Sequence, residues 1–168
     1  AARPDYVIAI TNSNIVIDGE SAPLGGITIV GAGIQINNAE NVTLRHLRIR
    51  VGDDPTGPEL SNRDALSILG SENVLIQNVS LSWSLDELAE VWGGSRNVIF
   101  DQVLFGEPLD AGGHGHGLLI GDGSTEVVVS NSVFAHLRKR APKFGFGTDE
   151  MGLSSGLLVN NIIYNPRG

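Results

Sequence analysis

The sequence predicts an all-β protein, a parallel β-helix built from short strands that stack coil upon coil. One strand pattern recurs along the chain, a second short apolar strand precedes most copies, and no segment shows a convincing helical period. The copies recur about every 24 to 32 residues, within the range typical of solenoids. The pattern occurs in NVTLRHLRI (41–49), NVLIQNVSL (73–81), NVIFDQVLF (97–105), EVVVSNSVF (126–134) and GLLVNNIIY (156–164).

Each predicted unit is a strand, a tight turn, a second strand and a variable loop. An early, truncated copy of the pattern is NIVIDG (14–19). The turns, such as NNAEN and GSEN, contain Gly, Asn and Ser, which tolerate left-handed backbone or bond to their own backbone. The strands that precede the turns are GIQI (33–36), ALSIL (65–69), LAEV (88–91) and GLLI (117–120).

Such units cannot each bury a core alone, so they are expected to stack as one domain, residues 1–168, of about six coils. A β-sandwich also has many short strands, but it does not repeat one strand–turn–strand unit at near-constant spacing. The long loops 50–63 and 106–116 are expected to carry function on one face. The predicted inward residues are Val42, Leu44, Val74, Ile76, Val98, Phe100, Val127 and Val129.

The composition limits the classes of partner that the chain is expected to bind. The net charge of −8 argues against nucleic acid as a partner, and no apolar run reaches the ~20 residues of a membrane helix. Cysteine is absent, which excludes disulfides. Cations nevertheless cluster locally, so a polyanion can bind if they or a bound metal dominate a groove. These cations are Arg45, Arg48 and Arg50, then Arg138, Lys139, Arg140 and Lys143.

Three carboxylates are expected to converge. Asp86 and Glu90 point out from the same face of one strand, and Asp64 heads the strand of the preceding coil. Adjacent coils lie ~4.8 Å apart, and carboxylates held this close repel one another unless a cation sits between them. Calcium takes six to eight oxygen ligands in loose geometry and suits such a cluster. The alternative is a set of solvated acids beside turns.

Four segments together resemble successive signature blocks of the pectate lyases of the right-handed parallel β-helix class. They keep the family's order and cover most of residues 26–165, and SLSWSLDE and RAPKFG are their most specific parts. The four are NVTLRHLRIRVGDD, DALSILGSENVLIQNVSLSWSLDE, HGHGLLIG and FAHLRKRAPKFG.

The resemblance implies a secreted polysaccharide lyase that cleaves polygalacturonate by calcium-dependent β-elimination. It implies that Asp64, Asp86 and Glu90 bind the calcium ion and that Arg140 is the catalytic base. A guanidinium is normally protonated, so Arg140 needs neighbours that disfavour its charged form, here Arg138, Lys139, Lys143 and the bound calcium ion. An alkaline pH optimum follows as a hypothesis. The expected substrate-binding residues are Lys143, Arg138, His114 and His116, although a Gly-flanked histidine is also often structural.

The sequence also departs from the family. Asn62 stands where some members have an acidic metal ligand, Ala111 where a lysine is expected, and Gln77 and Asn78 where many members have an acid–imidazole pair. These departures favour a second hypothesis, in which the chain is a scaffold that binds polyuronate without cutting it. A third hypothesis is a purely structural solenoid. The chain is also shorter than expected of the family, so part of the usual length is missing or an open coil end self-associates.

Overall fold

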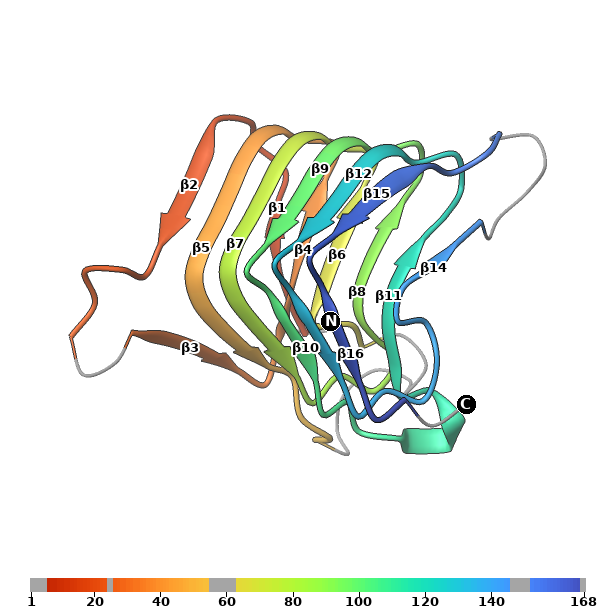
Figure 1. Cartoon of the computed structure of the whole chain (residues 1–168). Coiled ribbons are helices and arrows are strands. Elements are labelled where there is room, and N and C mark those ends of the chain that lie inside the picture. The colour runs from red at the N-terminus through yellow and green to blue at the C-terminus, as the bar shows by residue number, and fades with distance from the viewer. Residues whose placement is uncertain (1–5, 24–25, 55–62, 146–151, 167–168) are drawn as a thin grey trace, which may run out of the picture.

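The strands of the protein wind into a solenoid of stacked parallel coils (Figure 1). The structure is a computed structural model that describes residues 6–23, 26–54, 63–145 and 152–166. Every strand pairing within these residues is parallel. The predicted all-β, right-handed parallel β-helix is therefore confirmed, with about five coils where about six were expected.

Two sheets run along the described part of the stack. The first sheet has six strands in the order β1 (Val7–Ile10), β4 (Gly33–Asn37), β6 (Leu66–Leu69), β8 (Glu87–Trp92), β11 (His116–Ile120) and β14 (Lys143–Phe144). The second sheet has ten strands: β2 (Ile15–Asp18), β3 (Ile27–Val30), β5 (Glu40–Arg50), β7 (Glu72–Ser82), β9 (Arg96–Asp101), β10 (Leu104–Gly106), β12 (Thr125–Ser130), β13 (Val133–Ala135), β15 (Gly156–Val159) and β16 (Ile162–Tyr164). A short 3₁₀ turn, η2 (Ala111–Gly113), precedes β11.

All eight predicted inward residues are buried. The pairing of β5, β7 and β9 places Leu44, Ile76 and Phe100 opposite one another, and each is fully buried. Further along the stack the rings of Phe105 and Phe134 lie parallel, with centroids 4.5 Å apart. Identical inward positions on successive coils thus form continuous apolar rows, which explains why the repeat alone predicts the core.

Asparagines at the turns adopt the left-handed backbone that the turns require. Asn14, Asn41, Asn73 and Asn97 all have positive φ angles, and their side-chain amides hydrogen-bond from coil to coil at 2.8–3.2 Å. These four residues are called the asparagine ladder below. Asn78, one of the departures noted above, has φ 52° at the bend within β7. Asparagine tolerates this conformation better than most residues, so Asn78 has a structural role.

Among the described residues, no helix is both long enough and apolar enough to span a membrane.

Candidate active site

Several candidate site residues gather where strands of the first sheet begin. Asp64 lies just before β6, Asp86 lies just before β8, Glu87 opens β8, and His116 opens β11. His116 stands opposite Glu87 on one side and opposite Lys139 on the other. Because parallel strands pair in register, their first residues stack into one edge of the sheet. The connection that carries η2 leads directly into this edge (Figure 1).

Four carboxylates lie together at this edge. Carboxylate oxygens of Asp64, Asp86 and Glu87 lie within 4.8 Å of one another. Glu90 pairs in register with Ser67 of β6, and its side chain hydrogen-bonds to that of Asp64. Asp64, Asp86, Glu87 and Glu90 are called the acid edge below. The structure therefore brings together the three predicted acids and adds a fourth.

Hydrogen bonds hold Asp64 in a fixed orientation. One carboxylate oxygen accepts the backbone N–H of Glu87 at 2.9 Å, and the other accepts the hydroxyl of Ser67 at 3.1 Å. The first bond runs from the strand start of one coil to the strand start of the next. Asp64 thus faces the three acids of the next coil.

The acid edge is electrostatically unfavourable without a cation. Burial raises the pKa of Asp64 well above its ordinary value, and the nearby charges of Glu90 and Asp86 raise it further, while the Ser67 hydroxyl lowers it. Burial also raises the pKa of Glu90. A divalent cation would relieve this repulsion, and a donor set made only of carboxylate oxygens fits calcium. The predicted ligand set is chemically suited to the ion.

Arg140 reaches the acid edge through Glu87. The two side chains form an ion pair in which Glu87 is buried and Arg140 is mostly buried. Gly117 permits this approach, because a Cβ atom there would lie 2.3 Å from the carbonyl oxygen of Arg140. That carbonyl accepts the N–H of Leu118 at 2.7 Å, which docks the Arg140 segment against β11.

Burial is the main influence on the pKa of Arg140. Burial lowers the pKa of this guanidinium, while the carboxylates of Asp86 and Asp64 oppose the shift. Neighbouring cations were expected to lower this pKa, yet Arg138 instead pairs with Asp110. The Glu87 ion pair also favours the charged form of Arg140. The state of Glu87 therefore bears directly on whether Arg140 can act as a base.

The two histidines lie on the other side of Asp86. Nδ1 of His114 lies 3.0 Å from a carboxylate oxygen of Asp86. His116 is buried, and burial lowers the pKa of its imidazole. Its Nδ1 atom has no hydrogen-bond partner among the described residues. The two rings lie 5.5 Å apart at 48°, so both can face a shared ligand.

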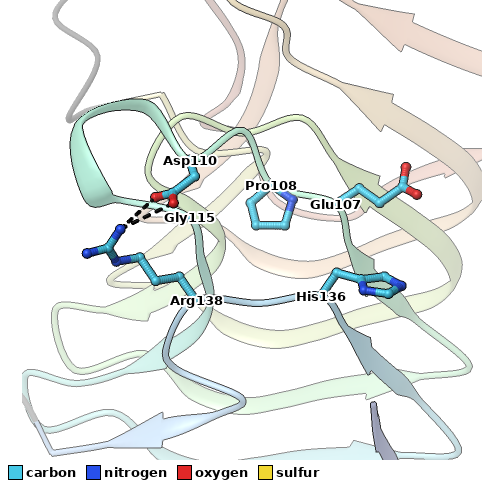
Figure 2. A pocket seen from close by; sticks show the side chains of 6 residues that line it. All are labelled: Glu107, Pro108, Asp110, Gly115, His136 and Arg138. Atoms are coloured by element: carbon cyan, nitrogen blue, oxygen red, sulfur yellow. Dashed lines mark hydrogen bonds and ion pairs between the residues drawn. The ribbon is translucent and has the colours of Figure 1, made fainter. Parts of the chain in front are cut away.

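Arg138 lines a cavity beside this site (Figure 2). Its Nη1 donates to both carboxylate oxygens of Asp110 at 3.2 Å. The cavity has a volume of about 330 Å³ and is lined by Glu107, Pro108, Asp110, Gly115, His136 and Arg138. Its lining is mostly polar, and Gly115 is part of it and also lies between the two histidines in the chain.

The remaining residues that were singled out from the sequence lie away from the acid edge or outside the described residues. Lys143 opens β14 opposite Leu119, which in turn stands opposite Glu90. Lys143 is therefore two strands from Glu90 along the same row. Ala111 opens η2, and Asn62 lies outside the described residues. No role was expected for Glu87, although it directly follows Asp86 in the sequence.

The chain is similar in sequence to several known proteins. The chain is 30% identical over 95% of its length to proteins named probable pectate lyase C from Aspergillus flavus and Aspergillus oryzae. It spans about a third (34%) of the length of these relatives. A protein named pectate lyase 5 from Ambrosia artemisiifolia is 31% identical over 57% of the chain, which spans 26% of that protein. No family model matches the chain.

Two solved structures share the fold. A pectate lyase from Paenibacillus sp. 0602 matches with a TM-score of 0.67 and 14% identity, over 96% of this chain and 46% of that one. A second pectate lyase matches with a TM-score of 0.63 and 16% identity, over 94% of this chain and 51% of that one. At these identities the likeness concerns the fold alone. The chain therefore resembles the pectate lyases, in sequence over nearly its whole length and in fold, as its signature blocks predict.

Proposed function

We propose that this chain carries the active site of a secreted polysaccharide lyase that cleaves polygalacturonate by calcium-assisted β-elimination. The observation that carries the proposal is the convergence of Asp64, Asp86 and Glu90 beside Arg140. In such a reaction the C5 proton of a galacturonate unit leaves, a double bond forms between C4 and C5, and the C4–O bond breaks. The released sugar oxygen then takes up a proton.

Asp64, Asp86 and Glu90 would hold the calcium ion. All three supply carboxylate oxygens, and their mutual repulsion favours a cation between them. When bound, calcium would neutralise the uronate carboxylate and stabilise the charge that develops as the C5 proton leaves. The hydrogen bonds from Glu87 and Ser67 keep Asp64 aimed at this position.

Arg140 would take the C5 proton on a guanidine nitrogen. It must be neutral at that moment, and its burial favours the neutral form. Glu87 opposes this by pairing with the charged form, so release of Nη1 by Glu87 is part of the proposed step. The pKa of a guanidine stays high even when it is lowered, which implies an alkaline pH optimum.

Lys143, Arg138, His114 and His116 would bind substrate around these groups. Lys143 is exposed on the row that contains Glu90, where its ammonium can meet a uronate carboxylate. Arg138 and its cavity would accept a neighbouring sugar unit. His114 and His116 would partly replace the lysine that the family resemblance expects in place of Ala111.

The test is an assay of polygalacturonate at alkaline pH with calcium or with a chelator. We expect ultraviolet absorbance of an unsaturated uronate to appear with calcium and to vanish with the chelator. Calorimetry should show that Asp86→Asn weakens calcium binding in the presence of substrate. Glu72→Gln, an acid on the second sheet, is the control and should bind calcium normally. Unchanged affinity in Asp86→Asn would remove Asp86 from the calcium site.

A second candidate function is binding of polyuronate without cleavage. The Glu87–Arg140 ion pair favours it, because a guanidinium held in its charged form is no base. Gln77 and Asn78 serve structure here: Gln77 donates to Asp101 at 3.2 Å, and Asn78 forms the bend of β7. Calcium-dependent binding of the polymer with no unsaturated product would select this function.

A further inference from the structure

We propose that Asp86, His114 and His116 form a second metal site, suited to zinc or a similar transition ion, at the border of the acid edge. The site goes beyond the proposed lyase reaction and does not depend on it. Donor atoms of the three side chains lie within 4.8 Å of one another. A carboxylate with two imidazoles is a ligand set that zinc prefers.

The backbone holds these three residues next to one another. The N–H of His116 donates to the carbonyl of Asp86 at 3.2 Å and to that of His114 at 2.7 Å. The carbonyl of Gly115, between the histidines, accepts the N–H of Arg138 at 2.8 Å. Coil pairing therefore fixes the spacing of the site before any ion arrives, which lowers the entropic cost of binding.

An unsatisfied buried nitrogen points to a missing ligand. His116 is only 5% exposed, and its Nδ1 has no hydrogen-bond partner among the described residues. A buried polar atom without a partner is unfavourable. Asp86 and His114 are already 3.0 Å apart, a separation suited to two ligands of one ion. A metal ion bound by Nδ1 would give His116 its partner, with Asp86 and His114 as the other two ligands.

Modest side-chain movement completes the site. Ligands at 2.0–2.1 Å around a tetrahedral zinc ion lie roughly 3.4 Å apart, so donor atoms that lie within 4.8 Å of one another must close by at most about 1.4 Å. The His114 side chain is 44% exposed and has the freedom to move. Its exposure also leaves a path for the ion and an open position for water.

The shared carboxylate links the two metal sites. Calcium prefers oxygen ligands to imidazole nitrogen, whereas zinc binds imidazole nitrogen readily. The acid edge thus favours calcium, and the histidine side of Asp86 favours zinc. Because both ions use Asp86, bound zinc lowers the affinity of the acid edge for calcium.

The experiment measures metal binding directly, in protein without a polyhistidine tag. Cobalt(II) should give the intense visible absorption of a four-coordinate site, and zinc should displace it. Zinc calorimetry on His116→Gln and His114→Gln should show at least about a 100-fold loss of affinity, above the typical 10–100-fold effect of residues that only orient ligands. His136→Gln, an exposed histidine of the neighbouring cavity, is the matched control and should bind zinc normally.

Three outcomes would overturn the site: no cobalt spectrum in the parent protein, unchanged zinc affinity in both His114→Gln and His116→Gln, or an equal loss in His136→Gln. Because His114 is half exposed, its variant should remain folded and keeps the test valid if His116→Gln does not fold. Calcium titration of His114→Gln should be normal, whereas zinc should weaken calcium binding in the parent. A parent protein that binds zinc but shows no lyase activity would count against the proposed function alone.

Discussion

The asparagine ladder and the acid edge are both rows of polar side chains stacked at the beginnings of parallel strands, yet their energetics are opposite. In the ladder, Asn41 donates to Asn14, Asn73 to Asn41, and Asn97 to Asn73. In the acid edge, Asp64 faces the charges of Asp86 and Glu90, and its pKa rises. An amide both donates and accepts, so copies of it satisfy one another, whereas ionised carboxylates only accept.

The difference teaches how to separate structure from function in a solenoid. Stacking places side chains of adjacent coils ~4.8 Å apart, which stabilises neighbours that are self-complementary and destabilises neighbours of like charge. A row that would be costly if left alone indicates a ligand that completes it. The acid edge is such a row, and the asparagine ladder is not.

The largest expected effect comes from a charge placed in the apolar core, which belongs to neither polar row and offers the charge no partner. Ile76 is fully buried between Leu44 and Phe100, so Ile76→Asp should unfold the domain, because an unpaired buried charge costs several kcal/mol. Circular dichroism and thermal melting check this. Leu75→Asp, at the adjacent and only half-buried position, is the control and should remain folded.

The next effect concerns the chemistry of the acid edge. If Arg140 is the base, Arg140→Lys should lose ~100-fold or more of the turnover, since a positioned base contributes that much. Its melting temperature and calcium binding should change little. Arg138→Lys, whose guanidinium pairs with Asp110 outside the acid edge, should be mild. Equal losses in both variants would mean a general cationic patch, and full turnover in Arg140→Lys would exclude Arg140 as the base.

A smaller effect is expected in the asparagine ladder. Asn73→Ala removes two ladder hydrogen bonds and places alanine at φ 57°, so it should cost about 2 kcal/mol of unfolding free energy. Asn73→Gly keeps the backbone conformation and should cost about half as much. Denaturant unfolding measures both. If the two variants are equally destabilised, the ladder bonds matter and the left-handed backbone does not.

The smallest effect reverses sign with calcium. The pKa of Asp64 in the folded state is raised, so its contribution to stability is present below its unfolded pKa and is lost as pH rises through the folded pKa. In calcium-free buffer near neutral pH, Asp64→Asn should therefore melt at a higher temperature than the parent. Saturating calcium should stabilise the parent more than the variant. A variant that melts lower in chelator would contradict the repulsion inferred here.

Much of the fold can be predicted from the sequence because one strand–turn–strand pattern recurs several times along the chain. The inward rows, the parallel pairing and the left-handed turn residues all depend on positions that recur in each copy. The carboxylates Asp64, Asp86 and Glu90 were also predictable, since stacking converts sequence separation into proximity. The spacing of residues within one repeat and the distance between adjacent coils are enough to predict such features.

Other parts of the site depend on contacts that no repeat encodes. The Glu87–Arg140 ion pair joins side chains two coils apart, and burial sets the pKa of Arg140 where neighbouring cations were expected to do so. The pairing of Arg138 with Asp110 arises in the η2 connection, which has no counterpart in the other copies. Irregular loops and side-chain directions are the features that a repeat cannot predict.

The order of coils also has a consequence for thermal behaviour. Asp64, Asp86, His116 and Arg140 come from four successive coils of the stack. Solenoids unfold by losing repeats stepwise, because each repeat is stabilised mainly by its neighbours. The site is therefore complete only while these four coils stay paired, and a local break between any two of them separates its groups. Inactivation on warming is expected to precede the loss of most β structure, because a local opening is enough to separate these side chains.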